Sequence, residues 1–405
     1  MRASSRRNPA YIKRKAAFRP ILLAMCTGYF VSKTLTPLFL QWGRAVEFVD
    51  KVTYKAIDYS NNELPKGLQK IYPSNPAAMK GPETVLFGPD DRMYVLTEDA
   101  NLVELRDLQQ DDKNANVINA TAVVVKDLGM GRPLGGRFTR DGTLYVADTL
   151  LGLTRVKDVH DATSKVEIVL NQIDGTPIRF ANDVVIGPKS GKVYFTDSTT
   201  IAPDRLLKKN SWDTLYCSKI DLARGNQTGR LIEYNPKTDE SRVLLNNIWF
   251  ANGLGIDPDE KFLIIAETFA LKLLRYDIAM GTESVAVKAD EMPGYPDGAD
   301  CSATHCYAVM PSSVVPLHKL FGAVPSWLSM ALRNLVMIVP KQLAPKTKKF
   351  GGLVQHNIET KETQLLLDPK GETVAMLTGV TVHKNKLYLG SLQNDYVGVY
   401  EPKVM

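Results

Sequence analysis

The sequence is poor in cysteine and histidine, with four and five copies in 405 residues. No two cysteines have the C-x-x-C spacing, and no set of cysteines and histidines has the spacing of a zinc site. Cys301 and Cys306 are separated by a short stretch that allows either a disulfide or two buried thiols. The sequence therefore gives no support to a metal site built on sulfur or imidazole ligands.

Excess charge is also absent from most of the chain, although the net charge is +6. Seven of the 50 basic residues lie in residues 1–19, where there is no acidic residue. The other 43 basic residues nearly balance the 44 acidic ones, so the body of the protein has no general field for a polyanion. We therefore expect no nucleic acid partner.

One long apolar run extends from Pro20 to Trp42 and could cross a bilayer of about 30 Å as a helix. Lys33 interrupts this run, but the cost of about 2.5–3.5 kcal/mol for a central lysine is partly offset by the surrounding Leu, Ile and Phe. A cleaved signal peptide is the alternative, yet no small-residue cleavage site follows the run. We predict an uncleaved membrane anchor at residues 20–42, preceded by a basic cytosolic tail at residues 1–19.

The basic tail also predicts the orientation of the chain. Positive charge stays on the cytosolic side, so the remaining chain should lie in the lumen of the endoplasmic reticulum or at the cell surface. Two N-glycosylation triplets, which begin at Asn119 and Asn226, fit this placement. The sequence thus predicts a single-pass membrane glycoprotein.

A repeated hairpin pattern fills the chain beyond about residue 80. Each copy has an apolar run, a turn with Asp, Pro, Gly or Lys, and a second apolar strand, usually with a Tyr near its centre. The copies begin at Thr84, Gly135, Asn182, Asn252, Asp297 and Gly379. Their spacing suits four-stranded blades better than a barrel meander, and two stacked sandwiches would not need the same hairpin in each unit. We therefore predict an all-β, six-bladed β-propeller over residues 80–405, with a linker leading into it at residues 43–79.

The stretch before the last copy changes from strand alternation to helical spacing. Within residues 312–350, apolar side chains recur at intervals of three and four and are followed by lysines. These are Leu328, Ala331, Leu332, Leu335 and Val336, and then Lys341, Lys346, Lys348 and Lys349. We predict a helical insertion between the last two blades, either as a cap over the propeller mouth that touches the bilayer or as a helical pair on a blade edge.

Five stretches of the repeated region resemble the strictosidine synthase-like branch of the gluconolactonase and paraoxonase superfamily. They read GRPLGGRF, NDVVIGPKSGKVYFTDS, GRLIEYNPKT, FANGLGIDPDEKFLIIAET and PGYPDG, in this order along the chain. With the N-terminal anchor, the resemblance covers nearly the whole sequence. It implies a propeller that binds a divalent cation, usually calcium, in its central channel.

The resemblance also implies four metal ligands, Glu83, Asn182, Asn252 and Asp297, at the start of four different copies. Strands that radiate from one axis bring equivalent positions together at one end of the channel. Two carboxylates and two amide carbonyls suit a hard cation, with water completing a shell of about six to eight oxygens. By the same resemblance, Asp297 is the catalytic residue that combines metal ligation with proton transfer during ester or lactone hydrolysis.

Two departures from the family limit the chemistry. The stretch RPLGGRF lacks the histidine of the paraoxonase type, and residues 377–380 lack the glutamate that strictosidine synthase uses as a base. Amine–aldehyde condensation therefore lacks its base, and we predict a membrane-anchored, calcium-dependent arylesterase or lactonase with a small-molecule substrate. The alternative is a catalytically silent propeller that binds a partner or lipid. A roomy apolar pocket at the four ligands would favour the enzyme.

Overall fold

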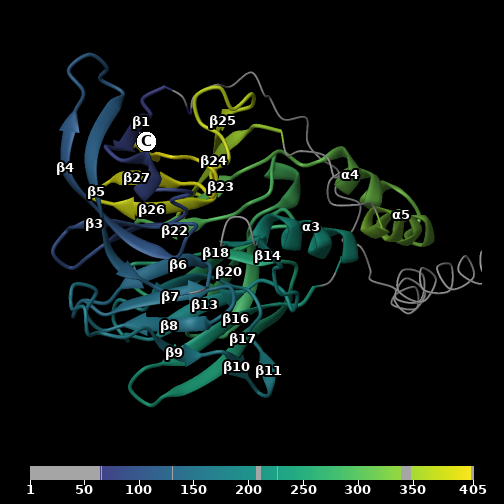
Figure 1. Ribbon diagram of the computed structural model, residues 1–405. Helices are drawn as coiled ribbons and strands as arrows, with labels where there is room; N and C mark the ends of the chain where they lie inside the picture. The colour runs from purple at the N-terminus through teal and green to yellow at the C-terminus, as the bar shows by residue number, and fades with distance from the viewer. Residues whose placement is uncertain are drawn as a thin grey trace, which may run out of the picture.

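The computed structural model describes residues 64, 66–129, 131–206, 211–225, 227–338 and 348–402. The predicted cytosolic tail and membrane anchor lie outside these ranges, as does Asn226. The described chain is mostly β, and its sheets are arranged around a common centre, with the helices gathered on one side (Figure 1). None of the helices in the described ranges is both long enough and apolar enough to span a bilayer.

All six predicted hairpins are confirmed, and each pairs two antiparallel strands. They are β2 (Val85–Phe87) with β3 (Met93–Leu96), β6 (Pro133–Phe138) with β7 (Leu144–Asp148), β12 (Ala181–Ile186) with β13 (Val193–Asp197), β18 (Ala251–Ile256) with β19 (Phe262–Glu267), β22 (Ala299–Cys301) with β23 (His305–Met310), and β26 (Gly379–His383) with β27 (Lys386–Gly390). The turn residues explain why the chain reverses where it does. Lys384 and Asn385 both have positive φ, as a two-residue hairpin turn requires.

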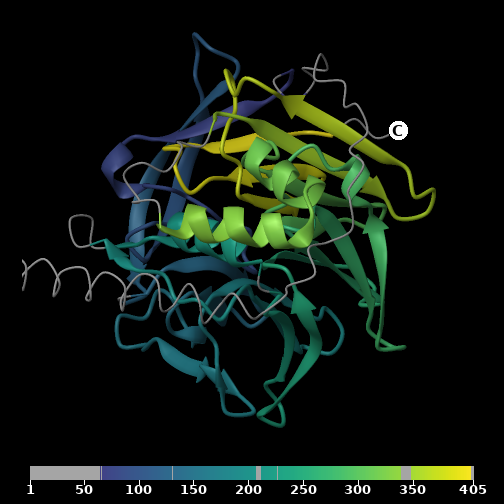
Figure 2. The same ribbon diagram turned by 90° about the vertical axis from the view of Figure 1, so that its right-hand side faces the viewer.

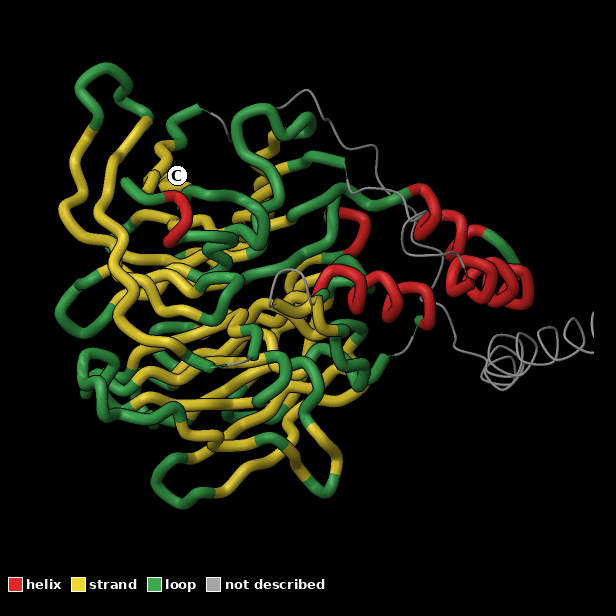
Figure 3. Tube along the Cα trace, in the orientation of Figure 1, coloured by secondary structure: helices red, strands yellow, loops and turns green. Residues whose placement is uncertain are grey.

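Four of the hairpins are extended by two outer strands into separate four-stranded sheets. The outer strands are β8 (Gly152–Val156) and β9 (Glu167–Leu170), β16 (Gly229–Asn235) and β17 (Glu240–Ile248), β20 (Lys272–Asp277) and β21 (Thr282–Val287), and β24 (Gly351–Asn357) and β25 (Thr363–Asp368). Two small hairpins stand outside these sheets, formed by β10 (Gln172–Ile173) with β11 (Thr176–Pro177) and β14 (Arg205–Leu206) with β15 (Ser211–Trp212). In Figure 3, strands and the loops that join them make up the body of the fold, and the long helices lie at its edge.

The first and last hairpins share one eight-stranded sheet, in the order β2-β3-β4-β5-β1-β28-β27-β26. Its further strands are β1 (Gln69–Pro73), β4 (Asn101–Gln110), β5 (Val117–Asp127) and β28 (Val397–Tyr400). β1 pairs antiparallel with β28 and parallel with β5. The beginning of the described chain therefore supplies a fourth strand to the C-terminal hairpin and joins the two ends of the fold.

The hydrophobic core lies between neighbouring sheets. Strand β13 shows why, because successive side chains of a strand point to opposite faces. Phe195 packs with residues of β7 on one side, whereas Tyr194 packs with residues of β19 on the other, and both are fully buried. The second strands of the first five hairpins are buried along their whole length, which is why they read as largely apolar runs in the sequence. In β27, Lys386 and Tyr388 are only partly buried.

The helical character of residues 312–350 is confirmed, but their predicted place between the last two blades is wrong. Helices α4 (Pro316–Ala323) and α5 (Ser326–Ile338) lie between β23 and β24, inside a single four-stranded sheet. The repeated hairpin marks only the first two strands of each sheet, so the sequence did not reveal that β24 still belonged to the same unit. An unpredicted helix, α3 (Thr214–Arg224), occupies the same kind of connection between β13 and β16.

Helix α3 has clear end signals. The side chain of Asp213 accepts a hydrogen bond from the backbone N–H of Tyr216, and Gly225 ends the helix in the left-handed conformation. Two short 3-10 turns, η2 (Pro76–Ala78) and η3 (Ala289–Glu291), complete the described helical elements. Local capping therefore defines α3 although its apolar pattern is weak.

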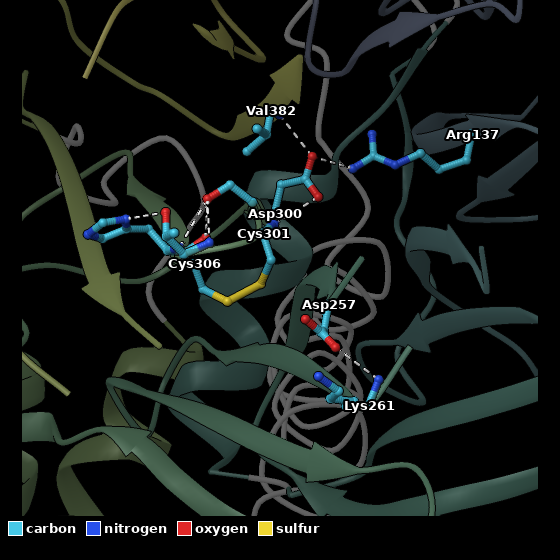
Figure 4. Close-up of a disulfide and its surroundings, with 10 residues drawn as sticks. Arg137, Asp257, Lys261, Asp300, Cys301, Cys306 and Val382 are labelled. Carbon is cyan, nitrogen blue, oxygen red and sulfur yellow. Dashed lines mark hydrogen bonds and ion pairs between the residues drawn. A yellow bond between two sulfur atoms is a disulfide. The ribbon is translucent and has the colours of Figure 1, made fainter. Parts of the chain in front are cut away.

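The alternatives for the cysteine pair are resolved by the structure. Cys301 and Cys306 stand directly opposite each other on β22 and β23 and form a disulfide (Figure 4). Cys217 in α3 is a buried free thiol. The disulfide therefore links two strands of one hairpin, next to the segment that carries Asp297.

Candidate functional site

A small cavity lies where the first strands of the six hairpins begin. Its lining includes three of the four predicted ligands, Glu83, Asn182 and Asn252, and also Gly298, which follows Asp297. The hairpins of β6 and β26 contribute residues such as Leu134 and Thr378 to the same lining. The cavity has room for about one water molecule or ion. The structure thus brings together residues that are far apart in the sequence.

Two hydroxyl groups orient the predicted amide ligands. Nδ2 of Asn182 donates a hydrogen bond to Oγ of Ser198 at 2.9 Å, and Nδ2 of Asn252 donates one to Oγ1 of Thr268 at 3.1 Å. Both asparagines are buried. Because each amide nitrogen is engaged, each carbonyl oxygen remains as the group that can bind a cation in the cavity.

The direction of these hydrogen bonds follows from the other bonds of the hydroxyls. The Ser198 hydroxyl donates to the backbone oxygen of Ala251 at 2.6 Å, and the Thr268 hydroxyl donates to that of Pro296 at 2.8 Å. A hydroxyl has one proton, so each must accept from its asparagine. Ala251 and Pro296 directly precede two further predicted ligands. Each hydroxyl therefore links one predicted ligand to the backbone beside the next.

The predicted carboxylate ligands lie in an environment that disfavours their charge. Burial raises the pKa of Glu83 well above its usual range; Arg132 lowers it, and Asp297 and Asp183 raise it further. Burial raises the pKa of Asp297 to about 8, with a lowering contribution from the Asn252 side chain and a raising one from Asp183. These mutual effects place the carboxyl groups in one electrostatic cluster. Such a cluster binds either protons or a cation.

The residues present fit a divalent cation that takes oxygen ligands. Oε2 of Glu83 is buried and has no hydrogen-bond partner in the described protein, so it is available as a ligand. Within the described ranges, no three His, Cys, Asp or Glu side chains gather closely enough to hold a metal by themselves. A cation at this position would therefore depend on the amide oxygens of Asn182 and Asn252 as well as on carboxylates.

Arg132 is a candidate functional residue that the sequence analysis did not identify. Its side chain is 3% exposed, and its Nη2 lies 3.9 Å from Oε2 of Glu83. Its Nε and Nη1 are buried without a hydrogen-bond partner among the described residues. A buried guanidinium with unused donors is suited to binding an anionic oxygen. The available signal was a lone basic residue immediately before the apolar strand β6.

A second polar group follows along the same strands, in which the Arg137 guanidinium interacts with two carboxyl groups, those of Asp300 and Asp183. Nη2 of Arg137 lies 2.9 Å from Oδ2 of Asp300, which also accepts a hydrogen bond from the backbone N–H of Val382 (Figure 4). Burial raises the pKa of Asp183 to about 6 and Arg137 lowers it, while Oδ2 of Asp183 accepts from the N–H of Leu254. These carboxylates therefore have cationic and backbone partners of their own.

The remaining predicted site residues are not part of this cavity. Asn119 is exposed on β5, as a glycosylated residue would have to be. Among the histidines, His383 stacks on Phe87 at 3.7 Å between ring centroids and lies 3.3 Å from Asp91. The buried His318 stacks on Tyr295. Both histidines therefore make ring contacts outside the cavity.

Comparison with known proteins connects this geometry to a family. The family model for strictosidine synthase matches residues 182–280. The chain is 27% identical over 357 residues to the strictosidine synthase-like 10 protein of Arabidopsis thaliana, covering 83% of this chain and 90% of that protein. It is 29% identical over 333 residues to the adipocyte plasma membrane-associated protein of Salmo salar, covering 78% and 74%.

Solved structures support the fold. A gluconolactonase from Xanthomonas campestris matches with a TM-score of 0.52 and 12% identity, covering 84% of this chain and 90% of that one. At this identity the match concerns the fold alone. The predicted propeller type is therefore confirmed, and the number of blades stays a prediction.

Proposed function

Since this chain contains a strictosidine synthase family domain and has a gluconolactonase-type propeller fold, we propose that it is a calcium-dependent hydrolase of small esters or lactones. The observation that carries this proposal is the single cavity at which Glu83, Asn182 and Asn252 meet beside Asp297, with both amide carbonyls left free by their hydroxyl partners. In a six-bladed propeller, the starts of the six hairpins would be arranged around this cavity, one from each blade.

The proposed chemistry assigns a separate task to each group. Glu83, Asn182, Asn252 and Asp297 would hold calcium, which would supply a Lewis acid that polarises the substrate carbonyl. Without a cation, burial raises the pKa of Asp297 to about 8, so the carboxyl holds a proton near neutral pH. Calcium would displace this proton, and the resulting carboxylate would accept one from the attacking water. Arg132, whose Nη2 lies 3.9 Å from Oε2 of Glu83, would offset the charge of that carboxylate and hold it in place.

We propose that the propeller lies in an oxidising compartment and is held to a membrane by residues 20–42, with the N-terminus in the cytosol. The disulfide between Cys301 and Cys306 supports an oxidising environment. The exposure of Asn119 supports a lumenal or cell-surface location. The similarity to a protein named as plasma membrane-associated supports the membrane placement.

The second candidate is a catalytically silent propeller that binds a partner or lipid. It is favoured by the size of the cavity, which holds about one ion and leaves no room for a substrate. In an enzyme, the substrate would therefore have to bind above the four ligands, at the mouth of the channel. The two candidates share the cation and differ in whether it performs chemistry.

The test combines calcium titration with hydrolysis. Purified full-length protein is titrated with calcium by calorimetry and then assayed on a panel of aryl esters and lactones, with and without chelator. Hydrolysis that stops in chelator and returns with calcium supports the enzyme. Calcium binding without hydrolysis supports the silent propeller, and absence of calcium binding contradicts both forms of the metal-site proposal.

A further inference from the structure

Helix α5 has a polar face that is buried against the protein and apolar side chains that are exposed. Its most buried side chains are polar, with Ser329, Arg333 and Asn334 exposed by 1%, 4% and 9%. By contrast, Trp327 is 66% exposed and Leu335 is 56% exposed. A helix that packs on a soluble domain normally turns its apolar stripe toward the core. The outer face of α5 is therefore not suited to water.

The exposed apolar surface continues onto the neighbouring helix α4, where Leu317 and Leu320 are 36% and 42% exposed. We call Leu317, Leu320, Trp327 and Leu335 the helix patch. The other large hydrophobic side chains that are exposed in the described chain are spread over strands and turns. Four of the nine exposed large hydrophobic side chains of the described chain thus lie on two helices that contact each other, and such a concentration marks a contact surface.

The chemistry around the patch favours lipid as its partner. Residues 312–350 contain five lysines and no Asp or Glu, and their one arginine, Arg333, is buried. A tryptophan and leucines on one face, with basic residues beside them, are typical of a helix that lies in the interfacial region of a bilayer. Anionic headgroups would complement the basic residues while the patch enters the apolar region.

The chain also keeps this patch close to a membrane if the proposed anchor is present. About 20 residues separate the predicted anchor, residues 20–42, from the first described residue, Leu64. A connection of that length spans at most about 70 Å. The helix patch would therefore remain within reach of the bilayer surface, and weak apolar contacts would suffice to hold it there.

The helices leave the sheets at the end of the channel that carries the predicted ligands. α3 follows β13, whose last residue, Asp197, is paired with Ala181 beside Asn182. α4 follows β23, in which the backbone oxygen of Val309 accepts a hydrogen bond from the N–H of Asp297. In Figure 2, α5 lies across the front of the ring of sheets. The patch and the predicted ligands are therefore on the same face of the molecule.

We infer that the helix patch binds the surface of the bilayer, so that the ligand end of the channel faces the membrane. This inference rests on the membrane placement in the proposed function and not on hydrolysis. It predicts lipid around Leu335, whereas a free surface would have water there. If another protein segment covered Leu335, neither lipid nor water would reach it.

The experiment uses full-length protein in phosphatidylcholine vesicles that contain phosphatidylserine. Leu335→Cys, in a Cys26→Ser background, carries a nitroxide label, and the background protein alone measures any labelling of the buried Cys217. The matched control is Met280→Cys, because Met280 is also a large hydrophobic residue and is 70% exposed, in the turn between β20 and β21. Collisions with oxygen report lipid, and collisions with a water-soluble nickel complex report water.

We expect the Leu335 label to collide often with oxygen and at least several-fold less with nickel than the Met280 label. Equal nickel collisions at the two positions would mean water and would overturn the inference. Low collision rates with both reagents at Leu335 would mean a covering protein segment, such as residues 43–63, and would overturn it as well. Flotation of vesicles with a variant that carries Trp327→Glu and Leu335→Glu tests the anchor separately, so its failure is distinguished from failure of the patch.

Discussion

Replacing Thr268 by valine tests the arrangement that orients Asn252. The hydroxyl of Thr268 accepts a hydrogen bond from Nδ2 of Asn252 and donates one to the backbone oxygen of Pro296, and the residue is 6% exposed. Valine has the same branched shape but can do neither. The amide of Asn252 would be free to rotate, and the backbone before Asp297 would lose one of its hydrogen bonds.

The expected effect is a loss of about 10- to 100-fold in calcium affinity, which is typical when a group that orients a metal ligand is removed. This range corresponds to about 1.4–2.7 kcal/mol of binding free energy. Thr268→Ser keeps the hydroxyl and should restore most of the affinity. The folded protein should also lose about 1–3 kcal/mol of stability, because buried polar groups are left without partners.

The assay is calorimetric titration with calcium, with thermal unfolding in chelator as a check of the fold. Thr149→Val is the matched control, because Thr149 follows β7 as Thr268 follows β19, and its buried hydroxyl has no partner in the described protein. Its hairpin carries Leu134 at the cavity in place of an asparagine. Wild-type affinity for Thr268→Val, or equal losses for the two variants, would refute the reasoning.

Three further predictions concern the cavity and its walls. Asp297→Asn should abolish ester hydrolysis at saturating calcium and leave the fold intact, whereas His383→Gln should remain active; the reverse result in a hydrolysis assay would exclude Asp297 as the base. In chelator, wild-type melting temperature should fall relative to Asp297→Asn as the pH rises from about 4 to 8, because the pKa of Asp297 is raised to about 8 on folding and its stabilising proton is lost over this window. An unchanged difference between the two melting curves would contradict the raised pKa. Gly298→Ala should destabilise the protein by about 1–3 kcal/mol in urea unfolding, since its Cβ would lie 2.5 Å from the backbone oxygen of Thr378. The control Gly322→Ala, in helix α4 with no atom within 4 Å, should be neutral or stabilising, and similar losses in both variants would argue against a steric cause.

The sequence by itself determined the six hairpins and the helical character of residues 312–350. Both depend on local rules, since turn residues set where the chain reverses and the spacing of apolar side chains sets the type of element. It also identified Glu83, Asn182 and Asn252, which line one cavity, as candidates from separate repeats. That was possible because these residues match the ligand pattern that the family resemblance implies, and equivalent positions in radiating strands share one end of the channel. The repeated hairpins therefore indicated that these residues, although far apart in the sequence, lie close together in the fold.

Only the tertiary structure decided which groups surround those candidates. Arg132 lies next to Glu83, and Thr268 turns the amide of Asn252, through contacts between residues that no local pattern connects. The periodicity of α5 predicted an amphipathic helix, but not that its polar side would be buried. That outcome depends on what each face meets after folding. The burial of a side chain and its hydrogen-bond partners depend on how the sheets pack against one another. The environment of the candidate site was therefore determined by tertiary packing, whereas the strands and helices were determined by local sequence.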